Sequence, residues 1–292
     1  MASNRRSFLA RLGAATAALA LPRPAAARGA AGAPPVVPPG ALTPEFWAEL
    51  RGQFLIPQGE AFFNTGTLGS SPRVVLDAVV EHMTHVDRDI AHWDYKEGHE
   101  NYFTGYYPED GVRTKVAALL NADHDEIALT QNATFGMNFM ANGLELSPSD
   151  EVVVMEGAHA GGRCGWELRD HRYGPTVRHV RVPVPPDDPA QLIDLWEAAT
   201  TPRTRVWAIP HLTSGTAILF PVDEMCRRAR ERGIISVVDG AQTFGHLAVD
   251  VRTMGADAWF TSPHKWLLAP KGTGVLYVRR ELLEGLWPTL AS

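Results

Sequence analysis

A lysine and an aspartate each stand directly after an apolar segment that has the composition of a buried strand. Lys265 belongs to Ser262-Pro263-His264-Lys265-Trp266, which follows Ala258–Thr261, and Asp239 follows Ile234–Val238. A lysine amine can form a Schiff base with an aldehyde, and a carboxylate can keep a pyridine nitrogen protonated. Together the two residues predict a site for pyridoxal 5'-phosphate (PLP), whereas Lys265 alone would indicate an ordinary surface lysine.

The lysine content of the chain favours a special role for Lys265. Only four of the 27 Lys and Arg residues are lysines, namely Lys96, Lys115, Lys265 and Lys271. Arginine therefore supplies most of the positive charge, and only lysine can readily release its proton to act as a nucleophile. A lysine kept at the end of a predicted strand is consistent with a requirement for its amine.

Further motifs, in this order and spacing, resemble those of the class V aminotransferase family of PLP enzymes, which includes cysteine desulfurases and isopenicillin N epimerase. The resemblance extends from Phe62 to Arg279. Its motifs are Phe62–Gly69, Gln131-Asn132-Ala133-Thr134, His159 seven residues before Trp166, Asp239-Gly240-Ala241-Gln242, Ser262-Pro263-His264-Lys265 and Gly272-Thr273-Gly274. The resemblance implies PLP as cofactor, an amino acid as small-molecule substrate, and a homodimer.

The resemblance also assigns the catalytic and ring-binding residues. Lys265 is the Schiff-base lysine and moves the proton at the substrate Cα, while Asp239 pairs with the pyridine nitrogen. Gln242 donates to the 3-hydroxyl of the ring, and His159 stacks on the ring face. The alternatives are a helix N-cap for Asp239 and a partly buried loop histidine for His159.

Five residues are expected to bind the cofactor phosphate. A phosphate requires backbone amides at a helix start together with hydroxyl or imidazole donors. Ala133 and Thr134 open a predicted helix, although a simple N-cap is the alternative for Thr134. By family match, Ser262 and His264 are further donors, and Thr273 reaches the phosphate of the neighbouring subunit.

The segment that contains Asn64, Gly66 and Thr67 matches a part of the family that closes over the substrate, so these three residues are candidate substrate contacts. A polar turn before a helix is the alternative. His82, His85, His92 and His99 invite a metal-site interpretation, with Asp87, Asp89 and Asp94 nearby. Only His82 and His85 have a close spacing, which favours solvated helix faces and no metal.

The first 27 residues are typical of a twin-arginine export signal. Arg5-Arg6 precedes the apolar stretch Leu12–Leu21 and the small-residue pattern Ala25-Ala26-Ala27. Cleavage would remove four arginines and no acidic residue, so the net charge of −6 would become −10. We expect a periplasmic protein, with no nucleic-acid or membrane partner after signal removal. Cys164, in a glycine-rich turn, and Cys226, in a predicted helix, are expected to be unpaired.

Residues 28–42 are expected to form a linker, and residues 43–75 an N-terminal segment of the small domain that closes over the active site. Residues 76–292 are expected to form the PLP-binding large domain. From Glu126 onward, apolar runs alternate with amphipathic helical stretches, which indicates an α/β domain with a mostly parallel, seven-stranded sheet. The resemblance implies the PLP-dependent transferase fold, fold type I. The apolar runs are Ile127–Thr130, Glu151–Met155, Thr176–Val182, Arg205–Ile209, Ile234–Val238, Ala258–Thr261 and Gly274–Val278. Residues that follow them, including His159, His211 and Asp239, should converge beyond the strand ends.

The sequence therefore predicts a PLP-dependent enzyme that acts on an amino acid, either a transaminase or an epimerase, closest to isopenicillin N epimerase-like members. One alternative is a C–S lyase that resembles cysteine desulfurase. Another is a non-catalytic binding protein or inactive fragment with the same fold. Family members continue into a C-terminal small domain, and we expect this chain to lack it together with its arginine for the substrate carboxylate.

Overall fold

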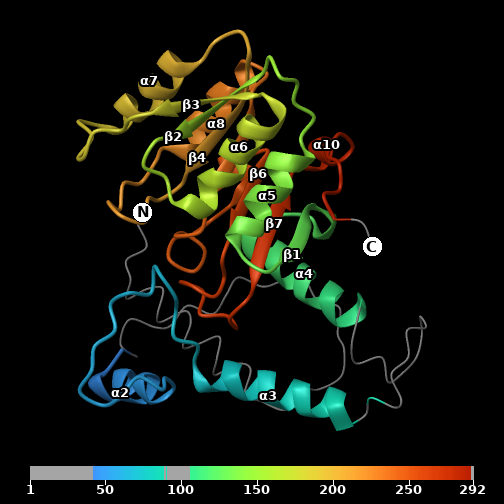
Figure 1. Cartoon of the computed structure of the whole chain (residues 1–292). Helices are drawn as coiled ribbons and strands as arrows, with labels where there is room; N and C mark the ends of the chain where they lie inside the picture. Colours follow the sequence, from blue (N-terminus) through green and yellow to red (C-terminus); the bar gives the residue numbers. More distant parts are fainter. Residues whose placement is uncertain (1–41, 89, 91–105, 291–292) are drawn as a thin grey trace.

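The structure is a computed structural model that describes residues 42–88, 90 and 106–290 (Figure 1). The predicted signal and nearly all of the linker lie outside these residues, as do Lys96, His92, His99, Asp89 and Asp94. Within the described residues, no helix combines the length and apolar character needed to cross a membrane.

A seven-stranded sheet forms the centre of the protein, with the strand order β1-β7-β6-β5-β4-β2-β3. Strands β2 to β6 pair in parallel, while β7 pairs antiparallel with both β1 and β6. The strands are β1 (Ile127–Thr130), β2 (Glu151–Met155), β3 (Thr176–Val180), β4 (Thr204–Pro210), β5 (Ile235–Asp239), β6 (Ala258–Thr261) and β7 (Gly274–Val278). The mostly parallel seven-stranded sheet predicted from the sequence is confirmed.

Helices cover both faces of this sheet (Figure 1). They are α4 (Tyr106–Leu120), α5 (Ala133–Gly143), α6 (Ala160–Tyr173), α7 (Pro189–Ala199), α8 (Val222–Glu231), α9 (Val251–Met254) and α10 (Arg280–Leu283). Because successive strand residues point to opposite faces, Val152 and Val154 join the core under α5 and α6, while Val153 joins the core under α7 and α8. The sheet is thus buried on both sides, as parallel sheets are.

The N-terminal part forms an arm that lies apart from the sheet, with α2 (Pro44–Gly52) and α3 (Arg73–Arg88) drawn in blue and cyan in Figure 1. Thr43 caps α2, since its side chain accepts a hydrogen bond from the Phe46 amide. Neither helix contains a buried residue. The predicted division between residues 75 and 76 falls inside α3, so the domain division stays a prediction.

Helix α6 is the main element that the sequence did not predict. Cys164 lies within it and not in a glycine-rich turn, which corrects that expectation. Three glycines lower the intrinsic helix propensity of this stretch by roughly 1 kcal/mol each. Packing compensates, because Gly165 lets α6 approach α5 so closely that a Cβ there would lie 2.3 Å from the Met137 sulfur. Cys164 and Cys226 are both free thiols, as predicted.

Candidate active site

The carboxyl ends of the parallel strands bring the chemically active residues to one edge of the sheet. His159 follows β2, His211 follows β4, Asp239 ends β5, and Lys265 follows β6. The backbone connects these ends directly, since the His211 amide donates to the Asp239 carbonyl at 2.9 Å. Parallel strands whose ends share an edge form the usual ligand-binding place of an open α/β sheet.

One pocket at this edge is lined by Lys265, Asp239, His159 and Gln242. Its remaining wall is formed by Gly157, Ala158, Pro210, Ala241 and the loop residues Leu212, Thr213 and Ser214. The structure therefore places the three predicted catalytic residues, and the predicted ring donor Gln242, around one space. Their chemical roles stay predictions.

Asp239 is a partly buried carboxylate that lines the pocket. Burial raises the pKa of Asp239, against the opposing effects of the Ala241 amide, Lys265 and His159. The Ala241 amide donates to Oδ1 at 2.9 Å, and among the described residues no donor has a hydrogen bond to Oδ2. Because burial penalises the charged form, a cationic partner in the pocket would be strongly favoured. The turn that follows Asp239 is not helical, so the N-cap alternative does not apply.

Lys265 is held next to this carboxylate in a partly buried position. Burial lowers the pKa of Lys265, and the charge of Asp239 opposes that shift. A lowered pKa increases the fraction of neutral amine, which is the nucleophilic form. Its backbone is fixed by a turn in which the Lys265 amide donates to the Ser262 carbonyl at 3.0 Å.

His159 caps the start of α6 and lines the pocket at the same time. Its Nδ1 accepts a hydrogen bond from the Gly161 amide at 3.0 Å. A ring nitrogen that accepts cannot carry the proton, so in the neutral ring the proton lies on Nε2. The orientation of the imidazole is thus fixed by the helix that it caps.

The predicted phosphate ligands lie where α5 begins beside the Lys265 loop. Asn132 is the N-cap of α5, since its side chain accepts from the Phe135 amide at 3.1 Å, which corrects the N-cap alternative for Thr134. The Ala133 amide donates to Ser262 Oγ at 2.9 Å, so it is already used within the protein. A Cβ on Gly161 would lie 2.6 Å from Thr134 Oγ1, which places this hydroxyl at the start of α6.

His264 and Thr273 contact each other across the loop that follows Lys265. The Thr273 carbonyl can only accept, so His264 Nδ1 donates to it at 3.0 Å. Burial lowers the pKa of His264. The Thr273 hydroxyl donates to the Pro270 carbonyl at 2.7 Å. Both side chains are therefore engaged within their own loop.

The predicted closure segment packs directly onto the site. The Gly66 carbonyl accepts from Gln242 Nε2 at 2.9 Å, and the Thr67 hydroxyl donates to Asn64 Oδ1 at 2.7 Å. The Gly69 amide donates to the His264 carbonyl at 2.9 Å. Residues 64–69 thus meet residues 242 and 264 although they are almost 200 positions away in the sequence.

His211 differs from the other strand-end histidines because it is buried and does not line the pocket. Burial lowers the pKa of His211 to about 4, so its imidazole is neutral near pH 7. Its side chain Nδ1 has no hydrogen-bond partner in the part of the chain that the structure describes. Its backbone amide, by contrast, donates to the Asp239 carbonyl and so connects the end of β4 to the end of β5.

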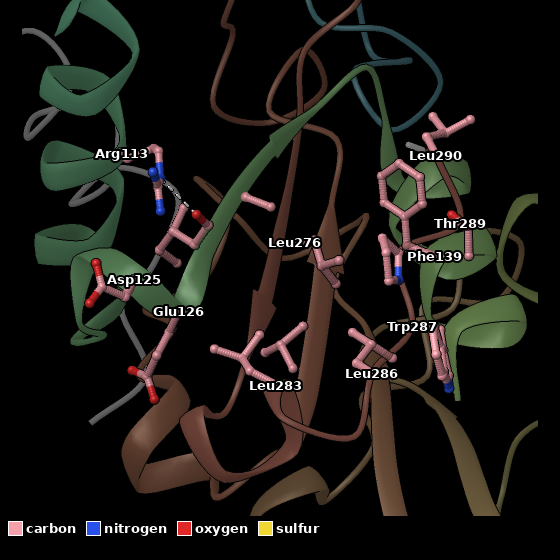
Figure 2. Close-up of a pocket in the computed structure, with 14 residues that line it drawn as sticks. Arg113, Asp125, Glu126, Phe139, Leu276, Leu283, Leu286, Trp287, Thr289 and Leu290 are labelled. Carbon is pink, nitrogen blue, oxygen red and sulfur yellow. Dashed lines mark hydrogen bonds between the residues drawn. The ribbon is translucent and has the colours of Figure 1, made fainter. Parts of the chain in front are cut away.

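A second hollow, shown in Figure 2, lies on another part of the sheet, next to α10. Its wall is largely apolar, with Phe139, Leu276, Leu283, Leu286 and Trp287 among its residues. Arg113, at one end, donates through Nε to the Ile127 carbonyl at 2.9 Å. No lysine, histidine or cysteine lines this hollow, so the Lys265 pocket remains the candidate active site. Among the described residues, no three His, Cys, Asp or Glu side chains are placed to hold a metal ion.

Three features of the pocket were not predicted from the sequence. The loop over Leu212–Ser214 forms part of the wall, Gly162 lies against Asp239, and Trp266 contacts Gln242. The position of Trp266 directly after Lys265 was the only local signal for its role. No sequence signal placed the loop beside the pocket, because that contact is set by the packing of β4 against β5.

The residues present fit PLP on chemical grounds. A partly buried amine, a partly buried carboxylate whose pKa is raised, and a fixed imidazole face one pocket. The amine can hold an aldehyde, and the carboxylate calls for a cation such as a protonated pyridine nitrogen. The fold and the site together are those of the PLP-dependent transferase fold, fold type I.

The chain belongs to the aminotransferase class-V family, whose profile matches residues 62–292. It is 33% identical over 246 residues to isopenicillin N epimerase of Streptomyces clavuligerus, covering 84% of this chain and 60% of that protein. Among solved structures, the cysteine desulfurase CsdA of Escherichia coli is 26% identical with a TM-score of 0.67, covering 84% of this chain and 61% of that one. These similarities confirm the predicted family and fold.

A further solved neighbour bears on the cofactor. A variant of C-DES with glycine covalently linked to its PLP cofactor is 25% identical, with a TM-score of 0.70, covering 83% of this chain and 62% of that one. The predicted cofactor class, PLP, is thereby confirmed for the family. The chain spans about 60% of the length of the relatives that it matches.

We predict that Gly162→Ala damages the site while Gly157→Ala does not. A Cβ on Gly162 would lie 2.2 Å from Asp239 Oδ2, so the carboxylate or α6 must move. A displacement of about 1 Å at a reacting group can reduce the rate roughly a hundredfold, so we expect a loss of about ten- to a hundredfold. A Cβ on Gly157, which lines the Lys265 pocket, would meet only Met155 Cε at 3.7 Å. Turnover and PLP titration of both variants test this, and equal behaviour of the two would contradict it.

Proposed function

We propose that this protein is a PLP-dependent enzyme that acts on an amino acid, as a transaminase or an epimerase. The observation that carries this proposal is the convergence of Lys265, Asp239 and His159 on one pocket at the carboxyl edge of the sheet. The similarity to isopenicillin N epimerase, at 33% identity, favours an epimerase-like member of the family. Twin-arginine export to the periplasm stays a prediction from the sequence, and cell fractionation with N-terminal sequencing would test it.

In this proposal each residue has a separate task. PLP, when bound, supplies an electron sink for negative charge at the substrate Cα. Lys265 holds the cofactor and afterwards accepts or returns the proton at that carbon, which its lowered pKa favours. Asp239 stabilises positive charge on the ring nitrogen. His159, oriented by the start of α6, covers one face of the ring.

The main alternative is a C–S lyase of the cysteine desulfurase kind, which the similarity to the Escherichia coli enzyme favours. A cysteine that attacks sulfur must be an exposed thiolate near the substrate. Cys226 is buried, and burial raises the pKa of its thiol to about 12. Cys164 is exposed on α6 but does not line the pocket. A non-catalytic protein is disfavoured by the assembled Lys265 and Asp239 pair.

We predict that borohydride reduction of the PLP-loaded protein attaches the cofactor to Lys265. The reason is that Lys265 is the lysine that faces the pocket, while Lys271 Nζ is engaged by Ser71 and the Gly69 carbonyl. Peptide mapping by mass spectrometry locates the label. Lys265→Ala should abolish the label and Lys271→Arg should keep it. Labelling of Lys271, or of no lysine, would overturn the proposed function.

Asp239→Asn should reduce turnover by at least ~10³-fold, which corresponds to about 4 kcal/mol of lost charge stabilisation. Asparagine preserves the shape of the side chain and the hydrogen bond from the Ala241 amide but provides no negative charge for the ring nitrogen. PLP binding should weaken much less than turnover. A near wild-type rate would show that Asp239 is only a structural residue.

We further propose that two copies of the chain associate through the N-terminal arm. No residue of α3 is buried, and its Val80 and Met83 are 64% and 61% exposed, while Phe63, which precedes α3 in the chain, is 79% exposed. Large apolar side chains exposed to this extent favour contact with a partner surface. A second copy would also place Thr273 in reach of a neighbouring site, as the family resemblance implies.

Sedimentation of a Val80→Asp, Met83→Asp double variant tests this association. The wild-type chain should sediment as a dimer and the double variant as a monomer, because two charges cannot be buried without partners. Leu168→Asp, at a 50% exposed position on α6, is the matched control and should leave the dimer intact. A monomeric wild-type protein would refute the association.

A further inference from the structure

Trp266, the residue after Lys265, makes a hydrogen bond that fixes the orientation of a neighbouring amide. Its indole Nε1 donates to Gln242 Oε1 at 2.7 Å. An indole nitrogen can only donate, so the oxygen of the Gln242 amide must face it and the nitrogen must point away. The two ends of a glutamine amide are otherwise interchangeable in shape, and Trp266 removes that ambiguity.

In this orientation the amide nitrogen of Gln242 points toward the closure segment and binds it. Gln242 Nε2 donates to the Gly66 carbonyl at 2.9 Å. Contact between the two segments is close, because a Cβ on Gly66 would lie 3.0 Å from Gln242 Oε1 and 3.6 Å from Trp266 Cζ2. If the amide turned over, its oxygen would face the Gly66 carbonyl and the two acceptors would repel each other.

Trp266 is itself held in place from the other side. Its ring stacks on His246 with the centroids 4.1 Å apart and an angle of 11° between the planes. The Gln242 carbonyl accepts from His246 Nδ1 at 3.2 Å. Trp266, Gln242 and His246 thus form a closed cluster in which neither ring can move without disturbing the glutamine.

We propose that Trp266 is a positioning residue that sets the Gln242 amide so that one N–H holds Gly66 and the other faces the pocket. Gln242 lines the pocket together with Lys265 and Asp239, and its Nε2 carries two protons, of which Gly66 takes one. The second proton is then presented to an acceptor oxygen of the bound molecule. The identity of that molecule rests on the proposed function, whereas the contact with Gly66 belongs to the free protein.

Trp266→Phe is the direct test, because phenylalanine can still stack on His246 but has no N–H. In the PLP-free full chain, hydrogen exchange measured by mass spectrometry should become at least about tenfold faster in a peptide that covers residues 62–72. The dissociation constant of PLP should rise several-fold. Trp207→Phe is the matched control, since it removes an indole hydrogen bond of similar length, 2.9 Å to Thr200 Oγ1, elsewhere in the sheet. It should leave exchange in this peptide unchanged.

Gln242→Glu provides a second, independent variant. A carboxylate can still accept a hydrogen bond from Trp266 but cannot donate one to Gly66. This variant should therefore also show faster hydrogen exchange in the peptide over residues 62–72. In the Gln242→Glu background, Trp266→Phe should add little further exchange, because both changes remove the same contact. Additive effects of the two substitutions would show that they act separately and would overturn the proposal.

The outcomes separate this inference from the proposed function. If the Trp266→Phe variant folds and its peptide over residues 62–72 exchanges hydrogen at the wild-type rate, the positioning role is overturned, even if PLP binds normally. Faster exchange in both variants with no PLP binding by the wild-type protein supports the positioning role and contradicts the proposed function. If the Trp266→Phe variant does not fold, the Gln242→Glu variant is the test. A wild-type rate of hydrogen exchange in its peptide over residues 62–72 would then overturn the proposal.

Discussion

The placement of Asp239 and Lys265 in one pocket determines what the rest of that pocket must provide. Burial raises the pKa of the carboxyl group and lowers the pKa of the amine, so both groups are less hydrated than they would be at the surface. Each of them nevertheless stabilises the charged form of the other. A parallel sheet can hold such a pair because its strand ends are backed by buried apolar layers on both faces, which exclude water from below.

Close backbone approach is the second condition for this site. Several elements reach the pocket only because they carry glycine where a Cβ would collide with a neighbour. A Cβ on Gly162 would meet Asp239, and a Cβ on Gly69 would lie 2.0 Å from the Lys265 carbonyl. The start of α6 and the closure segment can therefore pack directly against Asp239 and Lys265, the proposed catalytic residues. The same glycines weaken the local propensity for regular structure, so tertiary packing has to supply the stability of these segments.

The parts of the fold that the sequence predicted are those controlled by local pattern. Strands such as Glu151–Met155 and Gly274–Val278 were predicted with their observed ends, since continuous apolar runs are strong signals. The position of Asp239 and Lys265 at one edge followed from the same pattern. Helix α6 was not predicted, because its stability comes from contacts with α5 and not from its own residues. The orientation of Gln242 by Trp266 depends on a contact across 24 positions, and no periodicity in the sequence reports it.

The pKa shifts also connect the function of the site with the stability of the fold. A carboxyl group whose pKa is raised in the folded protein binds its proton more tightly there than in the unfolded chain. Its contribution to stability is therefore lost as the pH rises through the pKa of the folded state. A lysine whose pKa is lowered has the opposite dependence, and its full contribution appears only above the unfolded pKa. Both shifts mean that the charged forms of Asp239 and Lys265 are disfavoured in the folded protein relative to the unfolded chain. A cofactor that places a cation beside Asp239 and bonds to the amine of Lys265 would offset both unfavourable effects, so its binding would stabilise the folded protein.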